Sequence, residues 1–135
     1  MVQLKGVLPL QGLYRPEVVA AVNIIDSYQF GLITVNGKEY SLDIIISSSS
    51  IRSDWRRKRG HELCLEDIAE VLSENPEVLV VGTGASGLMK VRPEVKQAAQ
   101  ARGIKLIVDT TDKACKIYNQ LSCSQKVIAA LHLTC

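Results

Sequence analysis

Apolar residues are spaced along the chain in patterns that predict buried strands separated by helices. Val78-Leu79-Val80-Val81 is wholly apolar and ends in glycines, which is typical of a buried strand that leads into a tight loop. Ile104 to Val108 predicts a second buried strand. Val127 to Leu133 is apolar on both faces except at His132, and we interpret it as an interior strand, with a helix as the open alternative. Such strands need helices on both faces of their sheet, so the pattern predicts an α/β fold.

Helical spacing occurs in three segments between these strands. The first has the apolar positions Leu65, Ile68, Ala69 and Leu72, acids in its first turn, and an Asn-Pro pair that ends it at residues 75–76. Pro93 suits the first position of a second helix, and Gly103 is placed to cap its C-terminus. Thr111 is placed to cap a third helix. The apolar face of this third helix consists of Ala114, Ile117, Tyr118 and Leu121.

A β-hairpin is predicted between residues 28 and 46, because two alternating runs flank Asn36-Gly37. A two-residue loop would place Phe30 opposite Asp43, which mixes the two faces. A three-residue loop over residues 35–37, with Gly37 left-handed as a bulge, makes one face wholly apolar. It pairs Tyr28 with Ile44, Phe30 with Leu42, and Leu32 with Tyr40. We therefore predict the three-residue loop.

Size and composition fit one soluble domain. The chain has 135 residues, of which 47% are hydrophobic and 22% charged, and its apolar runs are too short for a membrane span. Its four cysteines include no Cys-x-x-Cys pair, and the start does not resemble a secretory signal, so we expect a reducing cytoplasm. His61 and Cys64, with His132 and Cys135, lack the compact ligand pairs of a structural zinc site, so no metal is predicted.

Basic residues gather between Arg52 and Arg59. Five basic residues and one acid give this segment +4, which leaves −2 for the rest of a chain of net charge +2. The segment could contact a phosphate, an acidic protein surface or nucleic acid, but a solvated loop fits equally well. With so few aromatic residues and near-neutral overall charge, nucleic acid ranks last among these partners. Trp55, Arg57 and Arg59 are the candidates for a protein contact, unless Trp55 belongs to the core.

The glycines after the central strand match a dinucleotide-binding pattern on paper. Gly82-x-Gly84-x-x-Gly87 is followed by Asp109 at the end of the next strand. That fingerprint needs a helix that begins inside the glycine loop, and such a helix would contain Pro93 in its interior at a cost of about 3 kcal/mol. We therefore predict no nucleotide cofactor. Close packing of strand and loop is the favoured role of the glycines, and a small anion held by loop amides is the alternative.

Several motifs taken together resemble a small protein family. They are Tyr28-x-Phe30-Gly31-x-Ile33, Gly37-x-x-Tyr40-x-x-Asp43-x-Ile45, Trp55-Arg56-x-x-x-Gly60-His61, Gly82-Thr83-Gly84, Thr111-x-x-Ala114-x-x-x-Tyr118-Asn119 and the final Leu131-His132-Leu133-Thr134-Cys135. They resemble the domain family of unknown function, in its archaeal and bacterial branch, that includes the mitochondrial complex I assembly factor 3 and the adipogenesis-associated domain-containing protein. The resemblance covers residues 24–135 and leaves residues 1–23 as an N-terminal arm. One departure is Thr110, where many members have proline.

The resemblance implies a single three-layer α/β domain with a mixed central sheet whose last strand is antiparallel to the others. It implies no settled activity, but the mitochondrial relative acts as a protein-binding assembly factor. We therefore expect a non-enzymatic protein-binding or assembly module with an unknown protein partner.

The alternative is a small-molecule or anion-binding protein, which could be an enzyme. Its site would lie at the carboxyl edge of the sheet, where ligands bind in open α/β sheets. The ligand-binding candidates are Gly82, Thr83, Gly84, Thr110 and Thr111 from two adjacent loops, with Arg56 or His61 near them. No nucleophile and base pair is evident. His132 and Cys115 carry suitable chemistry, but structural burial is the more common role for such residues.

Overall fold

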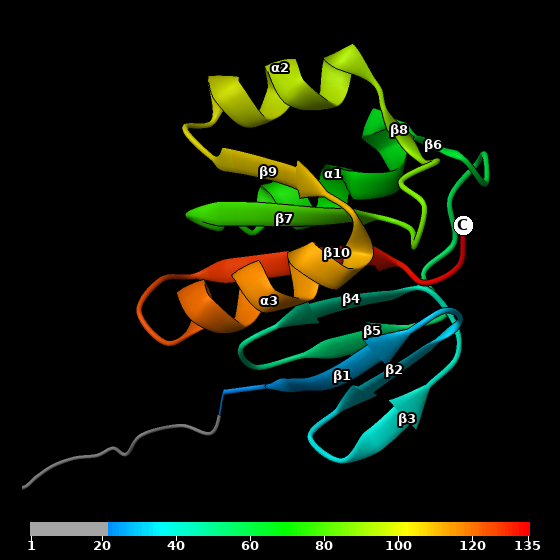
Figure 1. Cartoon of the computed structure of the whole chain (residues 1–135). Helices are drawn as coiled ribbons and strands as arrows, with labels where there is room; N and C mark the ends of the chain where they lie inside the picture. The colour runs from blue at the N-terminus through cyan, green and yellow to red at the C-terminus, as the bar shows by residue number, and fades with distance from the viewer. Residues whose placement is uncertain (1–21) are drawn as a thin grey trace, which may run out of the picture.

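A computed structural model describes residues 22–135 (Figure 1). Its strands are β1 Ile25–Gln29, β2 Leu32–Val35, β3 Lys38–Tyr40, β4 Ile44–Ser47, β5 Ile51–Ser53, β6 Glu62–Leu63, β7 Val78–Thr83, β8 Lys90–Val91, β9 Lys105–Asp109 and β10 Val127–His132. Its helices are α1 Leu65–Ser73, α2 Pro93–Ala101 and α3 Thr111–Ser122. None of these helices is long and apolar enough to cross a membrane. Apart from its last two residues, the arm predicted for residues 1–23 lies outside the described residues.

A mixed five-stranded sheet in the order β5-β4-β10-β7-β9 forms the middle layer, as predicted. The predicted direction of the last strand is wrong in part, because β10 is antiparallel to β4 but parallel to β7. Since β7 is also parallel to β9, the strand that runs against its neighbours is β4. The physical reason is the connection through α3. This helix carries the chain from the carboxyl end of β9 back to the level of its amino end, so β10 runs in the same direction as β9.

Both faces of the central sheet are covered, which confirms the α/β class. Helix α3 and the small sheet β1-β2-β3 lie on one face, and α1 and α2 lie on the other (Figure 1). Alternate residues of β7 serve the two cores: Val78 and Val80 pack with Tyr118 of α3, whereas Leu79 and Val81 pack on the side of α1 and α2. A strand that is apolar at every position is therefore required here.

The ends of the helices follow local signals in the sequence. The Asp67 side chain accepts a hydrogen bond of 2.9 Å from the Cys64 amide at the start of α1. Pro93 is the first residue of α2, and Gly103 follows that helix with φ 70°, both as predicted. The cap of α3 is Thr110 rather than the predicted Thr111, which is the first helical residue.

The predicted three-residue hairpin loop is wrong. Val35 lies opposite Lys38, so Asn36 and Gly37 form a two-residue loop, and their φ values of 53° and 79° suit a type I′ turn. The expected mixing of apolar and polar residues on one face does not occur, because β3 ends at Tyr40 and the chain then leaves the small sheet. Strand β4 pairs with β10 in the central sheet instead of extending the hairpin.

Candidate functional site at the carboxyl edge of the sheet

The two loops predicted to bind a ligand do meet at one edge of the sheet. Gly84 N donates a hydrogen bond of 2.8 Å to Thr111 Oγ1, and that hydroxyl donates one of 2.6 Å to the His132 carbonyl. Thr83 Oγ1 donates to the Asp109 carbonyl at 3.0 Å. Because the buried Thr111 hydroxyl has its donor and an acceptor site occupied within the protein, an anion at this edge would need other donors.

The glycines of the first loop allow backbone segments to approach closely. A Cβ atom on Gly82 would lie 2.8 Å from Thr111 Oγ1, and one on Gly84 would lie 2.6 Å from the carbonyl carbon of Cys135. Gly84 also has φ 104°, which disfavours any other residue. These contacts confirm the packing role favoured for the glycines. The next helix, α2, begins at Pro93, away from the glycine loop.

A largely buried cluster of three charged or polar side chains lies at the same edge. Asp43, just before β4, places Oδ2 2.8 Å from Arg57 Nη1 and 2.8 Å from Nδ1 of His132, the last residue of β10. The other carboxylate oxygen accepts a hydrogen bond of 2.7 Å from the Leu133 amide. Arg57 Nη2 contacts the Gly60 carbonyl at 2.9 Å. The cluster therefore joins the loop before β4, the basic segment and the end of β10.

Hydrogen bonding decides the protonation of this cluster. Burial would raise the pKa of Asp43, but hydrogen bonds from His132, the Leu133 amide and Arg57 outweigh it and hold the pKa below its ordinary value. An ionised carboxylate only accepts hydrogen bonds, so we assign a proton to His132 Nδ1 from its 2.8 Å contact with Asp43, which is shorter than the 3.0 Å between the same nitrogen and Arg57 Nη2. In the neutral imidazole this leaves Nε2 as an acceptor, and Nε2 is buried without a hydrogen-bond partner among the described residues.

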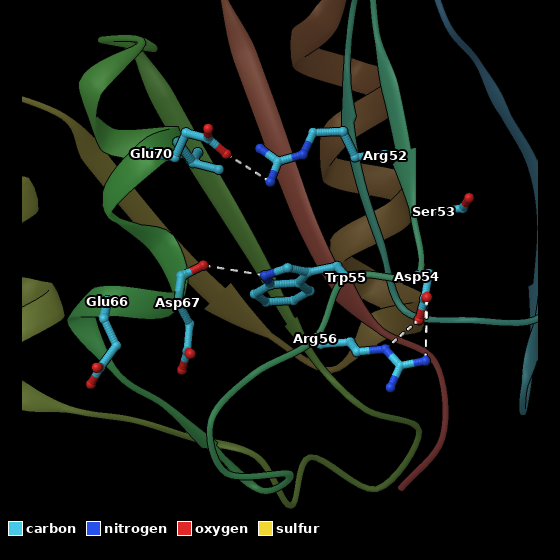
Figure 2. A pocket seen from close by; sticks show the side chains of 9 residues that line it. Arg52, Ser53, Asp54, Trp55, Arg56, Glu66, Asp67 and Glu70 are labelled. Atoms are coloured by element: carbon cyan, nitrogen blue, oxygen red, sulfur yellow. Dashed lines mark hydrogen bonds and ion pairs between the residues drawn. The ribbon is translucent and has the colours of Figure 1, made fainter.

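The side chains of Trp55 and Arg57, two of the residues predicted for a protein contact, are largely buried. Trp55 is 8% exposed, and its Nε1 donates a hydrogen bond of 3.2 Å to the Asp67 carbonyl of α1 (Figure 2). The Arg57 guanidinium lies 4.8 Å from the Trp55 ring centre, and its side chain is 4% exposed. Residues 55 and 57 of the basic segment therefore pack against the protein, held by the buried indole, its contact with the guanidinium and the ion pair with Asp43.

The exposed cations of the basic segment have acidic neighbours. The ion pairs are Arg52 to Glu70 at 2.8 Å, Arg56 to Asp54 at 3.0 Å, Lys58 to Glu66 at 3.7 Å and Arg59 to Glu62 at 3.5 Å. Figure 2 shows the first two of these pairs beside a groove between β5 and α1. The local excess of positive charge is therefore largely balanced by acids from neighbouring segments, which weakens the case for a polyanionic partner.

His61 lies at the carboxyl edge beside the last residue of the chain. Its Nε2 is 3.7 Å from Cys135 Sγ, and its ring centre is 6.0 Å from that of His132. Cys64 instead precedes α1, and the described part of the chain contains no group of three or more ligands that could hold a metal. Burial raises the pKa of the Cys115 thiol to about 12, so this cysteine is not an activated nucleophile.

An open groove of about 460 Å³ adjoins the buried cluster. Its lining includes Leu42, Asp43, Trp55, Arg56, Arg57 and Thr134. Leu42 is 52% exposed, and the Arg56 side chain is 81% exposed. The groove thus has a floor of paired charges and a rim with one apolar and one cationic side chain.

Sequence reasoning did not select Asp43, Leu42 or Thr134 for this site. Asp43 stands in one of the motifs of the family resemblance, and a carboxylate directly before three isoleucines is a signal that could have singled it out. The sequence offered no such signal for Leu42 or Thr134, because their positions on the groove depend on how β4 and β10 pair. Arg56 lines this groove, whereas Gly82, Gly84 and Thr111 lie in the packed loops beside it.

Solved structures of several proteins are similar to this chain. A conserved hypothetical protein from Pyrococcus horikoshii is 30% identical over 82% of this chain and 98% of its own, with a TM-score of 0.71. A protein from Bordetella parapertussis is 28% identical over 84% of this chain and 97% of its own, with a TM-score of 0.67. A Bartonella henselae structure described as an outer membrane protein is 26% identical over 84% and 97%, with a TM-score of 0.72. The model of the family described as "Protein of unknown function (DUF498/DUF598)" matches residues 25–132, and the chain belongs to that family.

Proposed function

We propose that this chain is a protein-binding or assembly module and that it uses the groove at the carboxyl edge of the sheet. The observation that carries this proposal is the exposed Leu42 and Arg56 pair above a floor that holds the Asp43–Arg57 ion pair. Asp43 and Arg57 have their strongest interactions within the protein, so they shape and stiffen the groove. An apolar side chain beside an arginine suits contact with a protein segment.

Peptide selection tests this proposal without a known partner. A random-peptide phage library is selected on the full chain, and the enriched peptides are measured by fluorescence anisotropy. We expect Leu42→Asp to weaken their binding at least tenfold. Leu65→Asp, an equally drastic change at an exposed leucine on α1, is the matched control and should leave the affinity unchanged. Failure to enrich any peptide, or equal weakening by both variants, would count against the groove as a binding site.

A second candidate is a small-molecule or anion-binding site at the Gly82–Gly84 and Thr110–Thr111 loops. Two observations favour it: His61 Nε2 lies 3.7 Å from Cys135 Sγ, and the nearby Nε2 of His132 has no hydrogen-bond partner among the described residues. Thermal shift of the full chain against inorganic phosphate, nucleotides and common metabolites tests it. A ligand-dependent rise in Tm that His61→Ala abolishes and Leu65→Asp preserves would favour this candidate over the protein-binding module.

A further inference from the structure

Strand β9 leaves one edge of the central sheet open. It is the last strand in the order β5-β4-β10-β7-β9, and within residues 22–135 it pairs only with β7 (Figure 1). Val108, its fourth residue, is 41% exposed. The opposite edge strand, β5, has three residues and exposes Arg52 and Ser53. Short, charged edge strands resist pairing, whereas longer apolar ones invite it, so β9 is the edge that is prepared for another strand.

The backbone of β9 determines which of its residues can pair outward. The Lys105 amide donates to the Glu77 carbonyl, and the Asp109 carbonyl accepts from Thr83, so both residues direct their backbone groups toward β7. Successive residues of a strand alternate in this respect. Leu106 and Val108 therefore present their N–H and C=O groups to the open edge.

The sequence of β9 is complementary to itself when it is read in the opposite direction. Lys105-Leu106-Ile107-Val108-Asp109 placed antiparallel to a second copy sets Lys105 opposite Asp109, Leu106 opposite Val108 and Ile107 opposite itself. We propose that two copies of this chain associate through β9 in this register, with Ile107 on the two-fold axis. The two central sheets then become one continuous sheet. This dimer uses an edge of the sheet apart from the proposed peptide groove.

Three features favour this register over its neighbours. It is the register in which both outward-facing residues of each copy exchange main-chain hydrogen bonds with an outward-facing residue of the other. It brings opposite charges together at both ends of the paired strands, because Lys105 and Asp109 lie on the same face of β9. It also gives Lys105, which has no ion pair among the described residues, an acidic partner. A slip by two residues would keep only part of these interactions.

Apolar surface beside the strand strengthens the case for a second copy. A groove of about 380 Å³ runs between α2 and β9 and is lined by Lys96, Ala99, Gln100, Ile104, Leu106 and Val108. In the proposed dimer the Leu106 and Val108 side chains of the two copies lie side by side on the α2 face of the joined sheet. The association therefore buries apolar area in addition to its hydrogen bonds.

Charge exchange between two variants tests the dimer and its register together. Sedimentation equilibrium of the full chain, at concentrations up to about 1 mM, measures the dimer Kd. We expect Lys105→Glu and Asp109→Lys each to weaken self-association roughly tenfold or more, because each sets like charges opposite one another at both ends. An equimolar mixture of the two variants should regain association, since opposite charges then face each other again. Asp109→Asn controls for loss of the contact between Asp109 Oδ1 and the Thr110 amide.

Val108→Pro gives a second readout that does not depend on charge. It removes an outward amide and leaves the ladder with β7 intact, so we expect a folded monomer by circular dichroism. Val108→Thr keeps the amide and should still dimerise. A wild-type chain that stays monomeric at about 1 mM overturns the proposal. A dimer that tolerates Val108→Pro, or a mixture of charge variants that stays monomeric, overturns the β9 interface or its register.

Discussion

Asp43→Asn should destabilise the protein far more than the same substitution at an exposed ion pair. Asp43 faces an Arg57 side chain that is 4% exposed, and it also accepts hydrogen bonds from His132 and the Leu133 amide. Asparagine keeps the shape but removes the charge, and its amide group turns a donor toward groups that are themselves donors. Removing one partner of a buried ion pair leaves the other charge uncompensated. We therefore expect the free energy of unfolding to fall by about 3–5 kcal/mol.

Asp54→Asn is the matched control. Asp54 also pairs with an arginine, Arg56, but that side chain is 81% exposed, so the loss should stay below about 1 kcal/mol. Asp54 has φ 60°, which asparagine also tolerates. The assay is urea unfolding followed by circular dichroism and by the fluorescence of Trp55, the single tryptophan, which stacks on Arg57. Equal losses at the two positions would refute the view that burial of the Asp43 network stabilises this edge.

Four further predictions concern the pH dependence of Asp43, the Thr111 hydroxyl, two glycines and two cysteines. Because the pKa of Asp43 is lowered in the folded state, the ionised carboxylate stabilises the fold fully above about pH 4, and this stabilisation declines as the pH falls below that value. The difference in unfolding free energy between wild type and Asp43→Asn should therefore shrink below about pH 4 in urea titrations. Thr111→Val leaves a buried amide and a buried carbonyl unpaired and should cost about 1–3 kcal/mol, whereas Thr111→Ser should recover most of it by the same assay. Gly84→Ala should lower Tm by several degrees, while Gly60→Ala, which has open space for its methyl group, should leave Tm nearly unchanged in calorimetry. Iodoacetamide at neutral pH should alkylate the exposed Cys123 and spare Cys115, whose pKa is raised to about 12, until the protein is unfolded; mass spectrometry that finds both labelled in the native state would contradict the burial of Cys115.

Much of the architecture was determined by signals that are local in the sequence. The wholly apolar run of β7, Pro93 at the start of α2 and Gly103 after it each specify a conformation through nearby residues. The tight packing at Gly82 and Gly84 was also foreseen, because glycines directly after a buried strand permit close backbone contact. The fold class follows from these elements, since apolar strands that alternate with amphipathic helices have few stable arrangements.

What the sequence could not determine depended on pairing between distant segments. The alternation of apolar residues predicted one long hairpin with a three-residue loop. Residues 44–47 pair instead with β10 in the central sheet, so the alternation was applied to a strand pairing that does not form. The local composition likewise predicted a basic patch at residues 52–59. The acids that pair with these cations come largely from other segments, among them α1, which follows later in the chain. The candidate site shows the same limit, because Asp43, Arg57 and His132 meet only after the sheet has formed. Local sequence decides which element forms, and only the tertiary structure decides which side chains face one another, because that choice depends on burial shared by the whole chain.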